Sequence, residues 1–162
     1  MEKIIIVFSD SHGSSFNMSE TVKKYPNAEC VIHLGDGADD TSYLALPPTT
    51  GLLCVKGNCD LFSREPAYNR VNLCGLDIIM CHGDAFGVKR GLDGYRAHAA
   101  AEGCDIALFG HTHTPLVERT DNGSRGLYLV NPGSISRPVT GKPSYAVIRV
   151  DGERFTVKIN TV

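Results

Sequence analysis

Short apolar runs recur along this chain, and each one is followed by polar residues close to a glycine. The first three, at residues 4–8, 30–34 and 52–55, are rich in the β-branched and aliphatic side chains typical of strands buried on both faces. Residues 17–24 have helical character and stop before a proline, and we expect a second, short helix at residues 39–46. This alternation predicts βαβ units and a mostly parallel sheet at the start of the chain.

The second part of the chain adds antiparallel hairpins to this pattern. We expect hairpins of residues 71–73 with 76–80, of 116–119 with 127–130 around Asp121-Asn122-Gly123, and of 144–150 with 154–159. A helix is expected over residues 88–101, closed by Gly103, and a buried strand over 106–109. Two packed sheets with helices on their outer faces would accommodate all of these elements. The sequence therefore predicts an α/β fold of mixed α+β character, in one domain of residues 1–162.

The composition argues against several classes of protein. A net charge of −2, with both signs mixed along the chain, gives no strong nucleic-acid footprint and no basic amphipathic helix for a membrane surface. No apolar stretch approaches the ~20 residues of a membrane span, and the run at residues 4–8 is too short for an export signal. The six cysteines form no Cys-x-x-Cys pair. We therefore expect free thiols, mostly buried, and a cytoplasmic location.

Carboxylate, imidazole and amide side chains follow the apolar runs in five clusters. They are Asp10, His12, Asp36, Asn58, His82, His111 and His113. Successive clusters are separated by about one strand and its return, so we expect them at the same end of neighbouring strands, where open α/β sheets bind ligands. Within each Asp-x-His or His-x-His pair, an extended backbone would point both side chains to one side. Such groups ligate divalent metals, and a pair of bound metals can activate water for the hydrolysis of phosphate esters.

Each cluster taken alone has an ordinary structural explanation. Asp10 could cap a helix, and Asp36 or Asn58 could be a turn residue. His82 could be a half-buried histidine with satisfied hydrogen bonds, and His-x-His also occurs on plain edge strands. Their occurrence together and in order, each after a buried run, favours a shared metal site over coincidence.

Read in order, the clusters are Asp-x-His, Gly-Asp, Gly-Asn-x-Asp, His-Gly and Gly-His-x-His. This set resembles the calcineurin-like metallophosphoesterase superfamily, and the chain is most similar to its small bacterial and archaeal phosphodiesterase branch, the group related to the retromer subunit of eukaryotes. The resemblance covers residues 4–136 and includes the segment 130–134. It implies a four-layer αββα sandwich of two mixed sheets flanked by helices, with the site at one edge. It also implies two divalent metal ions, with manganese favoured and iron, zinc, nickel or cobalt left open.

The resemblance further implies how the ligands are divided between the two metals. One metal takes Asp10, His12 and His113, the other takes Asn58, His82 and His111, and Asp36 bridges them. The residues agree, because a bridge needs a carboxylate with two oxygens and Asp36 is the only acid in its cluster. Asn58 can offer its carbonyl oxygen to a metal and its amide N–H to a phosphate oxygen. We expect a metal-dependent hydrolase in which a hydroxide shared by the metals attacks phosphorus, with Asp36 and Asn58 as catalytic residues.

Cys59 stands where much of the superfamily has a histidine that is held to protonate the leaving group. A thiol with an ordinary pKa of about 8.5, lowered further by nearby metals, replaces that acid poorly. The related phosphodiesterases also tend to carry cysteine here, so activity is still expected. The expected substrate is a small phosphodiester or nucleotide-like molecule with an aryl or nucleoside leaving group. An interaction scaffold of the same fold and a metal-dependent nuclease are the alternatives, and a homo-oligomer is left open.

Four further residues lie near the clusters without belonging to them. His33 precedes Asp36 by one strand register and could support a ligand or belong to the core. Asp60 and Asp84 follow their motifs closely and could orient ligand imidazoles or amides, although Asp84 could equally cap a turn. His98 is expected on the surface of its helix. With Cys59, the first three are the candidates for the pocket around the metals.

Overall fold

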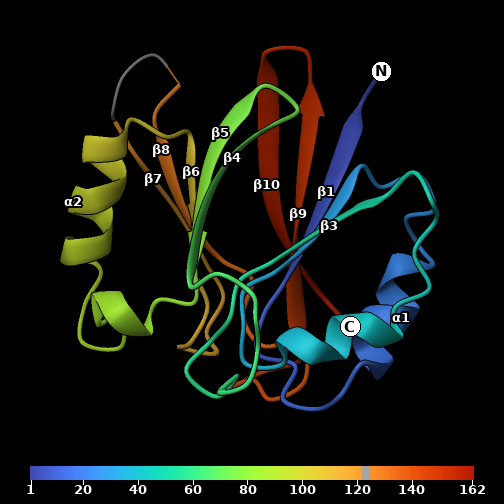
Figure 1. The fold of residues 1–162 in the computed structure, drawn as a ribbon. Coiled ribbons are helices and arrows are strands. Elements are labelled where there is room, and N and C mark those ends of the chain that lie inside the picture. Colours follow the sequence, from blue (N-terminus) through green and yellow to red (C-terminus); the bar gives the residue numbers. More distant parts are fainter. Residues whose placement is uncertain (122–124) are drawn as a thin grey trace.

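The computed structural model describes residues 1–121 and 125–162, and the strands of this part of the chain form two five-stranded sheets (Figure 1). The first has the order β10–β9–β1–β2–β3, with β10 (Arg154–Thr161), β9 (Ser144–Asp151), β1 (Lys3–Phe8), β2 (Cys30–His33) and β3 (Gly51–Cys54). The second has the order β4–β5–β6–β8–β7, with β4 (Tyr68–Leu73), β5 (Leu76–Cys81), β6 (Ile106–Leu108), β8 (Leu127–Asn131) and β7 (Leu116–Thr120). Both sheets are mixed, as the sequence predicts.

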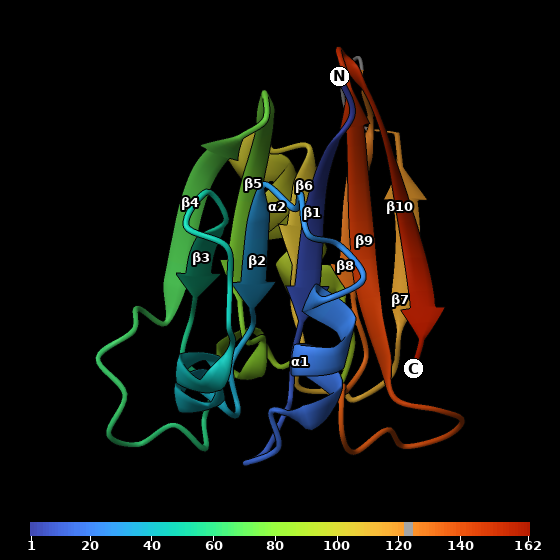
Figure 2. The same ribbon diagram turned by 90° about the vertical axis from the view of Figure 1, so that its right-hand side faces the viewer.

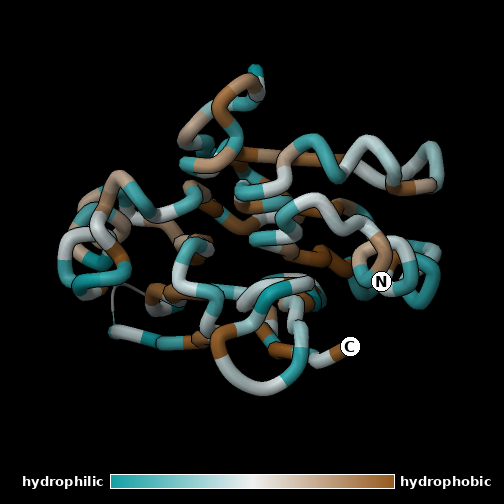
Figure 3. The backbone as a smooth tube through the Cα atoms, turned by 90° about the horizontal axis from the view of Figure 1, so that it is seen from below, coloured by the Kyte–Doolittle hydropathy of each residue, from teal (hydrophilic) through white to brown (hydrophobic). Residues whose placement is uncertain are grey.

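Each sheet contains a set of three parallel strands. In the first sheet β1 pairs with β2 and β2 with β3, and in the second β5 pairs with β6 and β6 with β8. The remaining strands, β9, β10, β4 and β7, add to these sets in antiparallel register. The carboxyl ends of β1, β2 and β3 lie at the lower edge of the molecule in Figure 2, and Figure 3 looks at the molecule from that side. The loops after these strands are therefore neighbours in space although they are distant in sequence.

Helices cover the outer face of each sheet, which gives the four layers of an αββα sandwich (Figure 1). Helix α1 (Phe16–Val22) lies against the first sheet and helix α2 (Asp93–Glu102) against the second. The residues of β1 are continuously apolar because both faces of this strand are covered. Ile5 and Val7 are fully buried between the two sheets, whereas Ile6 and Phe8 are fully buried on the side of α1. Because neither face of β1 meets water, no polar alternation is left in its sequence.

The three expected hairpins are present. Cys74 and Gly75 connect β4 to β5 with φ angles of 56° and 81°, the left-handed conformation of a tight two-residue hairpin turn. Strands β7 and β8 pair as expected, although Asn122 and Gly123 of the anticipated turn lie outside the described residues. In β10 the alternating residues Phe155, Val157 and Ile159 are half-buried and their neighbours Arg154, Thr156 and Lys158 are exposed, so one face of this strand meets solvent.

The helix boundaries differ from the expectation in two places. The helix expected over residues 88–101 begins only at Asp93, because Gly91 has a φ of 156° that interrupts any earlier helical turn. A short 3-10 helix, η2 (Asp84–Phe86), lies before it, and Gly103 closes α2 in the left-handed conformation as predicted. The short helix expected at residues 39–46 is also of the 3-10 type, η1 (Ala38–Tyr43).

All six cysteines are free thiols, and Cys30, Cys54, Cys81 and Cys104 are buried as expected. Cys74 is half-buried in its turn, and Cys59 is exposed. Burial raises the pKa of the Cys54 and Cys81 thiols to about 12, so both stay protonated and unreactive at neutral pH. Across the described ranges, every helix is too short or too polar to cross a lipid bilayer.

Candidate metal centre

The loops after the parallel strands bring six of the seven predicted ligands into two compact groups. Asp10, His12 and His113 form one group, and Asp36, His82 and His111 form the other. In each group one ligand atom of every residue lies within 4.8 Å of the others. Two loops of the first sheet, after β1 and β2, and two of the second, after β5 and β6, are thus joined at one edge of the sandwich.

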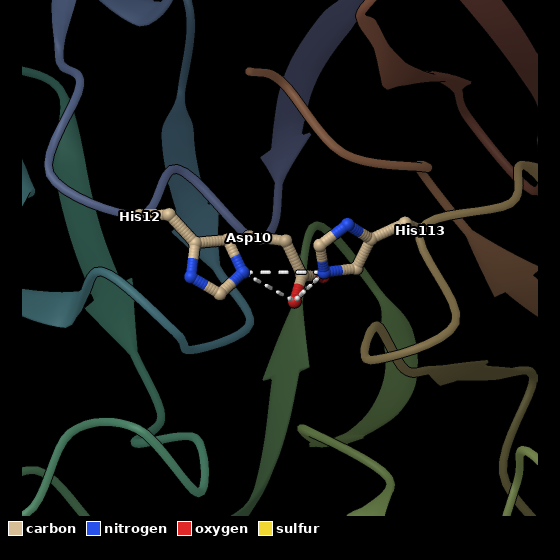
Figure 4. A group of neighbouring side chains, drawn as sticks. All are labelled: Asp10, His12 and His113. Carbon is tan, nitrogen blue, oxygen red and sulfur yellow. Dashed lines mark hydrogen bonds and ion pairs between the residues drawn. The ribbon is translucent and has the colours of Figure 1, made fainter. Parts of the chain in front are cut away.

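Figure 4 shows the first group, in which two imidazoles and a carboxylate point toward one another. Nε2 of His113 lies 3.2 Å from Oδ1 of Asp10 and 3.2 Å from Nε2 of His12. Nδ1 of His113 donates a hydrogen bond to the carbonyl oxygen of Arg137, at 2.6 Å. Since that proton occupies Nδ1, the Nε2 lone pair of neutral His113 is directed at the other two ligand atoms.

The second group has a similar construction, with Asp36 from the loop after β2 and both histidines from loops of the second sheet. Nε2 of His82 lies 3.2 Å from Oδ2 of Asp36 and 3.1 Å from Nδ1 of His111. Nδ1 of the buried His82 donates to the carbonyl oxygen of Leu34, at 2.8 Å. A backbone carbonyl therefore fixes the orientation of one histidine in each group, which is the usual support of a metal-binding imidazole.

Asp36 lies between the two groups. Its Oδ2 is 3.9 Å from Nε2 of His12 in the first group and 3.2 Å from Nε2 of His82 in the second. Although burial alone would raise it, the pKa of Asp36 is held well below its usual range by hydrogen bonds from His82 and from the Cys59 backbone N–H. Burial opposes a charge on His82 as well, but the Asp36 and Asp10 carboxylates raise its pKa above the ordinary value. The centre is therefore arranged to attract and hold positive charge.

One carboxylate oxygen of this centre is buried without a partner. Asp10 is fully buried, and its Oδ2 accepts hydrogen bonds from Ser9 Oγ at 2.6 Å and from the backbone N–H of His111 at 3.1 Å. Its Oδ1 has no hydrogen-bond partner within the described part of the chain. A bare buried carboxylate oxygen is costly, and a divalent cation is the partner that this oxygen and the surrounding imidazoles would satisfy. The mixed nitrogen and oxygen donors fit the metals named from the sequence.

The backbone of these ligands is strained. Asp10, His12, Asp36, His111 and His113 have φ angles of 56°, 46°, 55°, 68° and 58°, in the left-handed region that side chains other than glycine rarely adopt. Among the described residues, Cys74 is the only other non-glycine residue with a positive φ. The expectation that the paired ligands lie on extended backbone was therefore wrong. Their side chains converge because the loop turns sharply at each ligand, and strain of this kind clusters at functional sites.

Asp60 fixes the position of the loop that carries Asp36. Its carboxylate accepts the backbone N–H groups of Asp36 at 2.8 Å, Gly37 at 2.9 Å, Ala38 at 3.2 Å and Gly57 at 2.8 Å. The sequence suggested that Asp60 orients ligand imidazoles or amides. The structure shows that it instead holds the main chain around the proposed bridging ligand, and joins it to the loop after β3.

Two motif glycines are required by close approach between these loops. A Cβ atom on Gly35, whose φ is 97°, would run into the backbone of Gly57. A Cβ atom on Gly110 would overlap Ser9 Oγ and the Asp10 carboxylate. Any side chain at either position would separate neighbouring loops that carry predicted ligands.

The two groups consist of histidine and aspartate, and Asn58 is the remaining predicted ligand. Its side chain is exposed, and its amide donates only to Cys59 Sγ, at 3.6 Å, within the described residues. The backbone N–H of Cys59 donates to Asp36 Oδ1 at 2.8 Å, and Cys59 Sγ lies in a third group with His12 and Asp36. Desolvation and the neighbouring Asp36 carboxylate raise the pKa of the Cys59 thiol. Without metals, Cys59 is therefore a neutral thiol at the edge of the centre.

The remaining candidates differ in their distance from the centre. His33 is fully buried between the loops: Ser11 Oγ lies 2.9 Å from its Nε2, and its Nδ1 accepts the Gly35 backbone N–H at 3.1 Å. It supports the loops and is not a ligand. Asp84 is exposed and begins η2, in agreement with the turn alternative. His98 was expected on the surface, but it is half-buried against Phe86.

Sequence reasoning missed several residues that complete the site. Ser11 Oγ donates to Asp40 Oδ2 at 2.6 Å, and this buried pair holds the loop after β1. Asn131 donates to the carbonyl oxygen of Gly110 at 3.0 Å, which holds the loop after β6. The exposed Arg137 lines a hollow with His12, Asp36 and Cys59, and its guanidinium lies 3.4 Å from the His12 carbonyl oxygen. Only Asn131 carried a sequence signal, because it belongs to the segment 130–134 of the resemblance.

Comparison with known proteins identifies a family that matches most of the chain. Residues 3–153 match the model of the calcineurin-like phosphoesterase superfamily domain. The chain is 31% identical over 156 residues to probable metallophosphoesterase YsnB of Bacillus subtilis, covering 95% of this chain and 88% of that protein. It is 28% identical over 168 residues to phosphodiesterase YfcE of Escherichia coli K12, covering 88% and 85%. A solved structure from Streptococcus pneumoniae TIGR4, described as a predicted phosphoesterase, has 30% identity and a TM-score of 0.80 over 99% of this chain and 90% of its own.

Proposed function

This chain belongs to the calcineurin-like phosphoesterase superfamily, and we propose that it is a dinuclear, divalent-metal-dependent phosphodiesterase that hydrolyses small phosphodiesters. The phosphodiesterase relative in Escherichia coli supports a diester as substrate over a monoester. The proposal makes Asp10, His12, Asp36, Asn58, His82, His111 and His113 the metal ligands, with Asp36 shared between the two metals. Manganese is the metal that we favour.

The observation that carries this proposal is the pair of ligand groups joined by Asp36, together with the unpartnered Oδ1 of the buried Asp10. Either histidine group could occur alone in a structural role. Two groups at one sheet edge, each with its histidine oriented by a backbone carbonyl, are difficult to explain without cations. When bound, such cations supply Lewis acidity, which lowers the pKa of water and offsets negative charge at phosphorus.

The residues of the chain supply binding and orientation. Asn58 and Arg137 are exposed on two sides of the centre and carry N–H donors that would bind the phosphate oxygens. A guanidinium is always charged and presents its donors in a planar fork, so Arg137 suits an anionic diester. Both residues keep their donors accessible, and neither is committed to a strong hydrogen bond within the described residues.

The weak acidity of the Cys59 thiol limits which leaving groups can depart easily. It occupies the position where a proton donor would be needed for a poor leaving group, and its neutral thiol is a weak acid. Esters whose leaving group departs as a stable anion need no such donor. We therefore propose that aryl leaving groups, which depart as phenolates, are preferred over alkoxides.

The two alternatives fit the chain less well. A scaffold would have no reason to keep an intact set of ligands in strained conformations, because each strained residue costs stability. A nuclease for long nucleic acids gains affinity from many phosphate contacts, which a net charge of −2 does not favour.

Substitution of Asp36 tests the proposal. We expect Asp36→Ala to abolish hydrolysis of bis(4-nitrophenyl) phosphate in protein reconstituted with manganese, while circular dichroism shows a folded chain. The matched control is Asp39→Ala, because Asp39 is an exposed aspartate in the neighbouring η1. Metal content, measured by mass spectrometry of the dialysed proteins, should fall in Asp36→Ala only. Wild-type turnover or metal content in the Asp36 variant would refute the bridging assignment.

A further inference from the structure

A cavity of about 340 Å³ lies beside the candidate metal centre. Its lining includes Asn58, a proposed metal ligand, and Gly83, the neighbour of the proposed ligand His82. The rest comes from the loop between β3 and β4, from the ends of β4 and β5 and from η2, and it includes Leu61, Tyr68 and Phe86. Most of this lining is apolar. Binding of metals and a phosphate group does not account for this cavity, because a phosphate group alone would not need apolar walls.

The aromatic wall of the cavity is held in place from behind. The ring of Phe86 packs between those of Tyr95 and His98, with centroids 5.0 Å from each. Nε2 of His98 and the hydroxyl of Tyr68 are 3.1 Å apart, and the two rings meet edge to face at 5.5 Å. His98 therefore contacts both Phe86 and Tyr68 and restricts their movement. A rigid aromatic wall binds a flat ring at a lower entropic cost than a mobile one.

The lining also contains an apolar side chain that is unusual for an exposed loop. Leu61 is 80% exposed, although it lines the cavity and lies only a few residues from Asn58. The lining also includes three charged residues, Lys56, Asp84 and Asp60, and the carboxylate of Asp60 is occupied by backbone N–H groups of the neighbouring loop. An apolar slot with a few polar groups at its rim is typical of a pocket for a small organic ligand.

Building on the proposed function, we propose that this cavity binds the flat ring of one ester group of the diester, either an aryl ring or a nucleobase. Because Asn58 and Gly83 belong to its lining, the phosphate of a bound diester would reach the ligands while the ring enters the cavity. Tyr68, Phe86 and Leu61 contact the ring. Lys56 and Asp84 bind polar atoms at its edge.

Ring binding can be measured separately from hydrolysis. Saturation-transfer NMR on the full chain after chelation compares diphenyl phosphate with dimethyl phosphate, two diesters of equal charge. We expect the diphenyl ester to bind at least about tenfold more tightly, because its ring buries apolar surface. In Leu61→Ala this preference should fall several-fold. Leu52→Ala is the matched control, since Leu52 is an exposed leucine on β3 outside the cavity and should keep the wild-type preference.

Kinetics of the metal-loaded enzyme provide the second readout. Leu61→Ala should raise KM for bis(4-nitrophenyl) phosphate by about tenfold with little change in kcat, because it removes binding that the ground state and the transition state share. Tyr68→Phe, which keeps the ring and removes the link to His98, should raise KM less. A fall in kcat alone would show that Leu61 acts on the chemistry and would overturn the ring site.

The outcomes separate this inference from the proposed function. If no metal restores hydrolysis but the ring preference persists and depends on Leu61, the phosphodiesterase proposal fails and the ring site stands. If hydrolysis is present while both diesters bind equally, or while Leu61→Ala and Leu52→Ala behave alike, the ring site is wrong. Sedimentation tests a different occupant: a dimer of the wild-type chain that Leu61→Asp converts to a monomer, without any ring preference, would make this cavity a contact between copies.

Discussion

Replacement of Asp60 should disorganise the metal centre without touching any of its proposed ligands. One carboxylate accepts four backbone N–H groups, at 2.8 to 3.2 Å, from the loop that carries Asp36 and from Gly57. Asp60→Ala removes all of these acceptors at once. The N–H groups of this half-buried loop would then lack partners, and the left-handed turn at Asp36, whose φ is 55°, would lose its main external support.

The magnitude follows from the number of bonds. A hydrogen bond to a charged acceptor contributes about 1.5–3 kcal/mol when it is well shielded, and partly exposed bonds contribute about 1 kcal/mol each. Because Asp60 is half-buried, the lower figure applies, and the four bonds predict a loss of about 4 kcal/mol. This is a large share of the ~5–15 kcal/mol that stabilises an ordinary domain. The chain should therefore remain folded but unfold at a clearly lower concentration of urea.

Urea denaturation of the metal-free proteins, followed by circular dichroism, measures this loss, and calorimetric titration with manganese measures the effect on the centre. We expect Asp60→Ala to lower both the unfolding free energy and the metal affinity. Asp60→Asn, which keeps one acceptor oxygen, should lie between Asp60→Ala and the wild type. Asp39→Ala controls for the loss of an exposed negative charge nearby. If Asp60→Ala and Asp39→Ala were equally stable and bound metal equally well, the carboxylate would not support the loop.

Three further changes test other parts of the site. Cys59→His should raise the rate on alkyl diesters more than on 4-nitrophenyl diesters, because only the former need a proton donor; an equal change in kcat on both classes would contradict this account. Arg137→Ala should raise KM for diesters by about tenfold, whereas Arg137→Lys should recover part of the loss, and an unchanged KM in both would exclude a contact with phosphate. Burial lowers the pKa of His33 from 6.5 to about 4, so the unfolded chain takes up a proton below pH 6.5 that the folded chain refuses. Urea denaturation of the metal-free protein should therefore show stability falling by up to about 3 kcal/mol as the pH drops from 6.5 towards 4, and His33→Gln should lose this component.

The architecture was predictable because the apolar pattern in the sequence is strict. Residues 4–8 are continuously apolar since they face the other sheet on one side and α1 on the other, and the wet face of β10 shows as alternation. The helix before Gly103 was placed too early for a local reason. Val88 and Leu92 fit a helical pattern, and nothing in the sequence shows that Gly91 adopts a φ of 156° between them.

The site was predictable as a set of residues and not as a set of contacts. Order and spacing identified the ligands, but the backbone conformation at Asp10 and His12 depends on hydrogen bonds to Gly35 and Asp36 on the neighbouring loop. Arg137 gave no signal, because it reaches His12 only through the packing of segments more than a hundred residues apart. Such long-range contacts leave no periodic pattern in a single sequence.

The buried core stabilises the fold enough for the loops to hold the proposed ligands in strained conformations. The strained ligands lie within a few residues of strand ends whose apolar side chains are fully buried, such as Phe8 in β1 and Leu108 in β6. The core between the sheets supplies the stability, so the loops can hold carboxylates and imidazoles closer together than unliganded groups prefer. Because each proposed ligand follows within a few residues of a buried strand, the protein itself fixes its position. If the centre binds cations as we propose, it would select them by the arrangement of its donors and would not need to fold around them.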